Sequence, residues 1–144
     1  MKKTLATLIK LQKALVDEQR QQLSKLQDIL EEIERRIAAV EIEKAREQVA
    51  AENNPGATAT YGAFLKRITT RGRELEKERR IMVFAVDQAH AKLSELFEEQ
   101  KRYEIAEEAR LAAEIKEEQR RERLDLDEIG GVTHERRKGT RDGE

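Results

Sequence analysis

The chain has 144 residues, of which 29 are basic and 30 acidic, so that charged residues make up 41% and aromatic residues 3%. With no tryptophan and few other large side chains, it cannot fill a thick globular core, and this composition is typical of long helices or a coiled coil. A formal net charge of −1 and a regular apolar pattern favour folding over disorder. The absence of cysteine excludes disulfides and cysteine-based metal sites.

The first half of the chain follows a heptad pattern. Alternating steps of four and three residues from Leu5 select an apolar residue at most positions as far as Val40, and the pattern fails at Lys44 and Glu47. We call these the seam positions of the first half, and they are Leu5, Ile9, Gln12, Val16, Gln19, Leu23, Leu26, Leu30, Ile33, Ile37, Val40, Lys44, Glu47 and Ala51. The pattern predicts a helix over residues 4–51.

One interruption divides the chain, from Glu52 to Thr60. It contains Pro55, which is the only proline, followed by Gly56. Proline fixes its own φ and pushes the preceding residue out of the helical region, while glycine readily takes a positive φ. Residues 52–59 are therefore predicted to be a turn between two helices.

The second half accepts the same heptad template. Its seam positions are Tyr61, Leu65, Ile68, Gly72, Leu75, Arg79, Met82, Val86, Ala89, Leu93, Leu96, Gln100 and Tyr103. Residues 104–129 contain no glycine or proline and should stay helical, with a thin apolar pattern that includes Ile105, Ile115 and Leu126. Gly130-Gly131 is predicted to end this helix, and residues 130–144 read as a disordered tail.

Two matching seams joined by a short turn predict an all-α fold, a long antiparallel coiled-coil hairpin over residues 1–129 with a longer second helix. Two parallel zippers in a dimer are the alternative. With the tip near Gly56, Leu30 would face Met82 and Leu5 would lie near Glu107. The second helix would then project past the first as a single strand, where a charged helix depends on ion pairs or a partner.

The sequence offers no chemistry that would define an enzyme or a cofactor site. His90 and His134 lie far apart and lack the spacing of a zinc site, and the glycines lack that of a phosphate loop. The abundant carboxylates have no cleft that would shift their pKa values. Basic clusters lie among acids without interleaved aromatic residues, so nucleic-acid binding is not expected. No apolar run is long enough to span a membrane or to form a signal peptide, which predicts a cytoplasmic protein.

More apolar residues lie outside the seam than one helix interface can bury. Some would flank the seam, and the remainder would form exposed patches of the kind that bind partners. Phe64 and Phe84 are the best candidates, because aromatic side chains concentrate binding energy. The full set is Leu8, Leu11, Leu15, Ile29, Ile42, Val49, Phe64, Ile81, Val83, Phe84 and Phe97.

These features resemble the FliJ family of the bacterial flagellar type III export apparatus, and the related YscO-like stalk proteins of injectisomes. The resemblance lies in the Lys-rich start that leads into Leu5, Leu8, Leu11 and Leu15, and in the central break. It also includes the string from Tyr61 through Phe64 and Leu65 to Ile68, and the acidic end from Leu124 to Ile129.

The resemblance implies a hairpin similar to the terminal helices of the γ subunit of rotary F-type ATPases, acting in flagellum biogenesis and motility. It implies three protein partners, namely the export ATPase hexamer, the cytoplasmic domain of the export gate and export chaperones. No cofactor, metal or nucleic acid is implied. The chain would be cytoplasmic and peripherally associated with the inner-membrane export apparatus.

By the same resemblance, the ring-binding end would comprise residues 1–20 with 100–129. The residues expected to contact the ATPase ring are Leu8, Leu11, Leu15, Arg110, Arg120 and Arg121. Phe64 and Ile68 would belong to an exposed stripe that faces the export gate, while Tyr61 and Leu65 would support the seam. A generic coiled-coil scaffold, an injectisome stalk and a nucleic-acid-associated protein stay open as alternatives, as do the identity of the chaperones and the oligomeric state.

Overall fold

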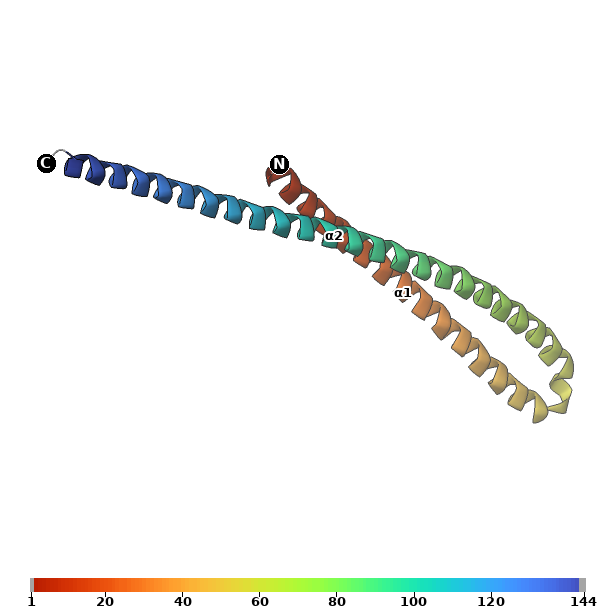
Figure 1. Ribbon diagram of the computed structural model, residues 1–144. Coiled ribbons are helices and arrows are strands. Elements are labelled where there is room, and N and C mark those ends of the chain that lie inside the picture. Colours follow the sequence, from red (N-terminus) through yellow and green to blue (C-terminus); the bar gives the residue numbers. More distant parts are fainter. Residues whose placement is uncertain (1, 143–144) are drawn as a thin grey trace. The chain divides into compact units, whose positions relative to one another are not determined.

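The computed structural model describes residues 2–142, with side chains for residues 4–136 and 139. Helix α1 spans Lys2–Glu52, a 3₁₀ turn η1 spans Pro55–Ala57, and helix α2 spans Thr58–Asp142. The two helices run in opposite directions from the turn and contain 51 and 85 residues (Figure 1). The all-α fold with a longer second helix is therefore confirmed, and the described residues contain no strand.

The turn between the helices is built by Asn54 and Pro55. Asn54 has φ −135° and ψ 91°, an extended conformation that a following proline requires. The Ala57 amide donates to the Asn54 carbonyl at 3.1 Å, and the Thr58 hydroxyl donates to the Pro55 carbonyl at 3.2 Å. No glycine of the described chain has a positive φ, so Gly56 does not shape the turn in the way its usual role suggests.

The chain divides into two compact units, and one of them is the hairpin unit, Leu11–Glu99. Its buried side chains all lie at predicted seam positions, and they are Gln12, Val16, Leu23, Ile33, Val40, Ile68, Leu75, Val86 and Ala89. The remaining seam positions of the unit are half-buried, apart from Glu47, whose charged side chain is exposed. The heptad count thus identified the packed face of each helix.

Two apolar clusters hold the hairpin unit together. Leu23 packs with Val86 and Ala89, and the partly buried Leu26, Leu30 and Leu93 surround them. Nearer the turn, Val40 packs with Ile68 and Leu75 against Ile37, Phe64 and Leu65. These contacts agree with the predicted register, in which residues equidistant from Gly56 face each other.

The second unit comprises residues 1–10 and 100–144 and contains the ends of both helices. Leu5, Ile9 and Tyr103 are half-buried within it. Beyond them the half-buried positions of α2 are all charged. One is Glu104, and the others continue the heptad count as Glu107, Arg110, Glu114 and Glu117. From 118 to 136 every side chain is exposed, and the apolar residues predicted as a thin seam, Ile105 and Ile115 among them, are exposed as well.

The carboxyl end of α2 differs from the sequence expectation. The helix does not end at Gly130-Gly131 but continues to Asp142, and disorder of residues 130–144 stays a prediction; residues 143–144 lie outside the described chain. A glycine inside a helix costs about 1 kcal/mol relative to alanine but leaves the hydrogen bonds intact, unlike proline. Neither glycine adopts a positive φ, and the Thr133 hydroxyl donates to the Ile129 carbonyl at 2.8 Å within the continuing helix.

Candidate partner-binding surfaces

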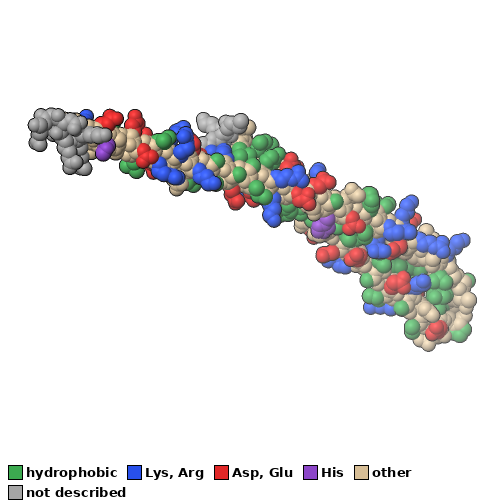
Figure 2. All heavy atoms as spheres, in the orientation of Figure 1, with side chains coloured by type: hydrophobic (Ala, Val, Ile, Leu, Met, Phe, Trp, Pro, Cys, Tyr) green, Lys and Arg blue, Asp and Glu red, His purple; other side chains and the backbone are tan. Residues whose placement is uncertain are grey.

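Exposed apolar side chains are the most prominent candidates for function in this structure. The described residues contain no cluster of three or more side chains that would suit a metal ion. His90 is exposed, and its Nε2 lies 3.5 Å from the Gln27 Nε2 across the hairpin. Figure 2 shows hydrophobic side chains reaching the surface between intermixed charges.

The three leucines assigned to the ATPase ring are exposed on α1. Leu11 is 56% exposed, and Leu8 and Leu15 are less exposed, at 37% and 38%. Leu11 and Leu15 belong to the hairpin unit, and Leu8 to the second unit. Each is therefore available to a partner.

The three arginines assigned to the ring are engaged in ion pairs within α2. Arg110 bonds Glu107 at 2.6 Å and Glu114 at 2.9 Å, and its side chain is three-quarters covered. Arg120 pairs with Glu117 at 2.7 Å, and Arg121 lies 3.5 Å from the same carboxylate. The hydrogen bonds that Arg110 donates to Glu107 and Glu114 raise the pKa of Arg110, and the bond that Arg120 donates to Glu117 lowers the pKa of Glu117. These cations stabilise their own helix, and only Arg120 and Arg121 keep most of their surface exposed.

The two residues assigned to the export gate have different environments. Ile68 is only 5% exposed and packs with Val40 and Leu75, so it does not belong to an exposed stripe. Its place at a seam position explains this, because the seam faces α1. Phe64 is half-buried against the same cluster, and its ring stacks on Tyr61 with centroids 6.5 Å apart. Phe64 is therefore partly exposed, and Ile68 is almost fully buried.

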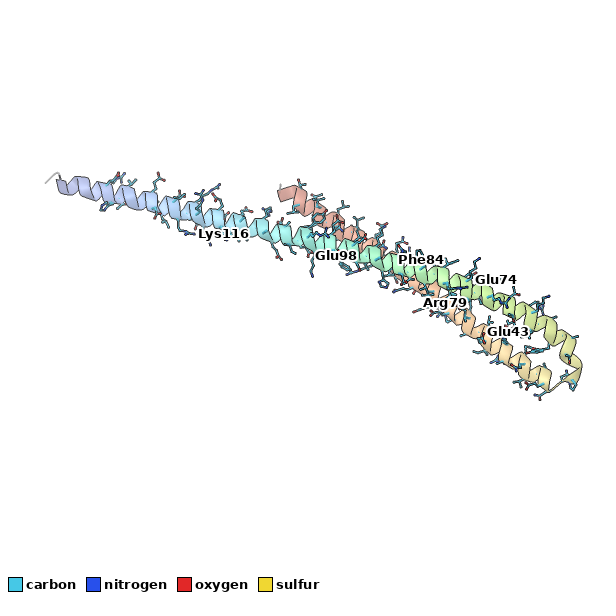
Figure 3. The ribbon with its side chains drawn as sticks, turned by 45° about the vertical axis from the view of Figure 1, so that its right-hand side comes forward. Glu43, Glu74, Arg79, Phe84, Glu98 and Lys116 are labelled. Atoms are coloured by element: carbon cyan, nitrogen blue, oxygen red, sulfur yellow. The ribbon has the colours of Figure 1, made fainter. Side chains whose placement is uncertain are left out.

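Further along α2, Phe84 is the most exposed aromatic side chain of the described residues, at 65% (Figure 3). Ile81 precedes it by three residues and is also exposed. Such an i, i+3 pair lies on one face of a helix. The sequence-based expectation that Phe84 is exposed is therefore confirmed.

Two features of the interface were missed at the sequence level. Gln12 is buried, and its amide donates to the Leu96 carbonyl at 2.9 Å, while Gln19 donates to the Ala89 carbonyl at 3.2 Å. Arg20 lies over the ring of Phe97 at 4.8 Å from its centroid. The signal for the glutamines was present, since both stand at seam positions where an apolar residue is usual.

The fold and these surfaces define a class of protein, an α-helical hairpin with exposed apolar side chains. The family model described as "Flagellar FliJ protein" matches residues 1–139. The chain therefore belongs to the FliJ family, whose members are components of the flagellar export apparatus and serve protein transport. No curated protein and no solved structure matches the chain. Neither helix contains, among the described residues, a stretch apolar enough to cross a bilayer.

Proposed function

We propose that this protein is the central stalk of the ring-shaped export ATPase and links that ring to the export gate. Membership of the FliJ family carries the proposal. Two long helices packed along an apolar seam support it, because such a hairpin is stiff enough to transmit force along its length. The chain would act by contact and by shape, with the chemistry carried out by the ATPase.

The mechanism follows from a mismatch in symmetry. A single hairpin inside a sixfold ring presents a different surface to each subunit, so the subunits cannot all be equivalent while it is bound. Different contacts bias each subunit towards a different nucleotide state, which is coupling between sites in the thermodynamic sense. By reciprocity, nucleotide binding in the ring changes the affinity for the hairpin.

Each unit offers its own candidate contacts to the ring. In the hairpin unit these are Leu11 and Leu15, whose exposed apolar surface would be buried on binding. In the second unit they are Leu8, Arg120 and Arg121. Because Arg110 is already held by two carboxylates, we assign it the role of keeping α2 helical where it meets the ring.

Contacts with the export gate are proposed at aromatic residues of the hairpin unit. Phe64 is partly exposed, and Phe84 is largely exposed. Aromatic anchors of this kind supply much of the energy of protein interfaces. Ile68 is left out of this surface because the seam buries it. The protein would hand export chaperones to the gate, working in the cytoplasm and peripherally at the inner membrane.

The experiment that tests the stalk measures ATP hydrolysis by the export ATPase of the same organism with and without this protein. The intact protein should promote hexamer formation and raise the rate of hydrolysis. Leu11→Asp together with Leu15→Asp should abolish this stimulation, because two charges would have to be buried in the ring interface.

A matched control is Ile29→Asp, which places the same charge on an exposed residue of the same helix. It should stimulate the ATPase as the unmodified chain does. Two results would contradict the stalk role. One is that the unmodified protein fails to stimulate the ATPase, and the other is that Ile29→Asp abolishes stimulation while the Leu11→Asp, Leu15→Asp variant retains it. Phe84→Ala should weaken binding of the gate domain about tenfold without changing ATPase stimulation.

A further inference from the structure

A groove with charged walls runs along one side of the hairpin unit near the turn. Its centre is a hollow of about 320 Å³ whose floor is formed by Ile37, Val40 and Ile68. The hollow exists because Gly72, a seam residue, has no side chain, and because the neighbouring Thr69 is small. The α1 wall carries Glu41 and the half-buried Lys44, and the α2 wall carries Arg73 and the half-buried Glu76.

The two charges belong to rows with heptad spacing. The acidic row on α1 consists of Glu34 and Glu41, and the basic row on α2 consists of Lys66, Arg73 and Arg80. A spacing of seven residues keeps the members of a row on one face of their helix. All five side chains are exposed. Because Glu41 and Arg73 line the same hollow, the two rows lie on the same side of the hairpin.

The rows also lie at matching heights along the hairpin. Val40 faces Gly72 across the interface, and the next residues in sequence, Glu41 and Arg73, stand at that level. One heptad away from the turn, Glu34 stands at the level of Arg80 by the same count. One heptad towards the turn the residue on α1 is the neutral Gln48, at the level of Lys66.

The charges of the two rows act on neighbouring residues of the hairpin at longer range, Glu34 on Arg79 and Arg80 on Glu76. Among the residues that the structure describes, no member of either row forms an ion pair, whereas Glu76 and Arg79 beside them pair at 2.6 Å. Gln48 is exposed as well, and its side-chain carbonyl can accept a hydrogen bond from an ammonium group. Two acids, an amide and three bases on one side of the hairpin are therefore available to another molecule.

The two exposed rows are complementary to a second copy of themselves under one rotation only. A twofold axis parallel to the hairpin places α1 of one copy over α2 of the other, so that each acidic row meets a basic row at the same height. The other way of stacking the same faces, with the copies antiparallel, places α1 over α1 and sets acidic row against acidic row. Like charges directly opposed are unfavourable, so charge selects the parallel arrangement.

We propose that this groove is the interface of a homodimer in which two hairpins pack side by side with their turns together. The two groove faces then form a four-helix bundle. At three levels a residue of one copy meets a residue of the other, Glu34 with Arg80, Glu41 with Arg73 and Gln48 with Lys66, and the twofold axis repeats each pair. This inference goes beyond the stalk function, and its test does not involve the ATPase. The interface is short and largely polar, so the dimer dissociates readily and is sensitive to salt.

Sedimentation velocity of the full chain tests the proposal between about 1 and 500 µM, in low salt and in about 0.5 M salt. The expected result is a dimer that forms with rising concentration in low salt and is at least about tenfold weaker in high salt. A chain that stays monomeric throughout overturns the proposal and leaves the groove to a helix of another protein.

Charge reversal gives the sharper test. The double variant Glu34→Lys, Glu41→Lys should be monomeric, as should the double variant Arg73→Glu, Arg80→Glu. An equimolar mixture of the two should form a heterodimer, because one copy then carries basic side chains on both helices and the other carries acidic ones at the matching levels. Failure of the mixture to associate overturns the proposed pairing, provided that circular dichroism shows both variants to be helical.

The matched control reverses two exposed acids of α1 outside the groove, Glu18→Lys and Asp28→Lys, and should still dimerise. The orientation is tested with Gly56→Cys, the single cysteine of an otherwise cysteine-free chain. A short bifunctional maleimide should join two copies at their turns. Antiparallel copies would hold their turns roughly 50 Å apart at 1.5 Å per residue, so dimerisation without cross-linking overturns the parallel arrangement.

Discussion

Gly72 faces Val40 across the helix interface, and a Cβ added to Gly72 would lie 3.7 Å from the Val40 Cγ1. That distance is ordinary van der Waals contact, so the interface has room for a methyl group at this point. Gly72 also stands in the middle of a long helix, where glycine is disfavoured because it loses more backbone freedom on folding than alanine does. The chain therefore gives up stability at this seam position.

Replacing Gly72 by alanine should raise the free energy of unfolding by about 1 kcal/mol from helix propensity, with a further gain from contact with Val40. Urea denaturation followed by circular dichroism measures this change. Gly62→Ala is the control, because a Cβ there would touch nothing within 4 Å and reports propensity alone. A smaller gain at Gly72 than at Gly62 would show that the added methyl group strains the interface.

The sequence predicted the packed faces well because one rule, the heptad step, governs burial in a two-helix interface. It placed Leu23, Val40 and Val86 in the core and left Leu11 and Phe84 outside, as the structure has them. The positions of the charged side chains were harder to predict. Arg110 reads as a surface cation, yet Glu107 and Glu114 hold it, since partners three and four residues away in one helix compete with any external partner.

The same rule explains the misplacement of Ile68. The family resemblance assigned it to an exposed stripe, whereas its seam position predicted burial, and the structure agrees with the seam. The helix end at Gly130 was misjudged for a different reason. Glycine permits a positive φ but does not impose it, and without a proline nothing in the local sequence forbids a helical continuation.

Leu23→Ala should lower the free energy of unfolding by about 2 kcal/mol or more, because Leu23 is buried against Val86 and Ala89. A two-helix interface can partly close over the missing atoms, which places the expected cost at the lower end for such a change. Thermal and urea unfolding measure it. Ile81→Ala, at a residue that is 59% exposed, should change stability by less than about 0.5 kcal/mol. Equal effects of the two substitutions would contradict the assigned core.

Gln12→Leu should raise the free energy of unfolding by about 1 kcal/mol, because a buried seam position would gain apolar surface. Its partner, the Leu96 carbonyl, lies within α2 and keeps its helical hydrogen bond when the amide is removed. Gln12→Ala is the comparison and should lower stability by a similar amount. If Gln12→Leu is also destabilising, the bond from the amide to Leu96 contributes more than apolar burial would.

Acid should destabilise the hairpin partly through Glu76. The hydrogen bond from Arg79 lowers the pKa of Glu76 below its ordinary value of 4.5, against a smaller opposing effect of desolvation. A carboxyl whose pKa is lowered by folding stabilises the fold above its unfolded pKa, and that contribution disappears as the pH falls through the lowered value.

The urea midpoint should therefore fall less between pH 7 and pH 3 in Glu76→Gln than in the unmodified chain. Glu95→Gln serves as the control, since Glu95 forms no ion pair within the described chain and its replacement leaves the pair of Glu76 with Arg79 intact. An identical acid response in all three proteins would show that the pair with Arg79 adds nothing to stability.

Residues 118–136 of α2 should exchange their amide hydrogens much faster than the hairpin unit does. Every side chain in this range is exposed, so the helix has no apolar packing to oppose fraying, and isolated helical segments are marginal in water. Hydrogen exchange read by mass spectrometry should show strong protection at the peptides that contain Leu23 and Val40. Glu117→Ala removes the partner of Arg120 and Arg121 and should speed exchange in the neighbouring turns. Slow exchange over 118–136 in dilute protein would contradict the absence of packing there, and unchanged exchange in Glu117→Ala would show that these ion pairs do not hold the helix.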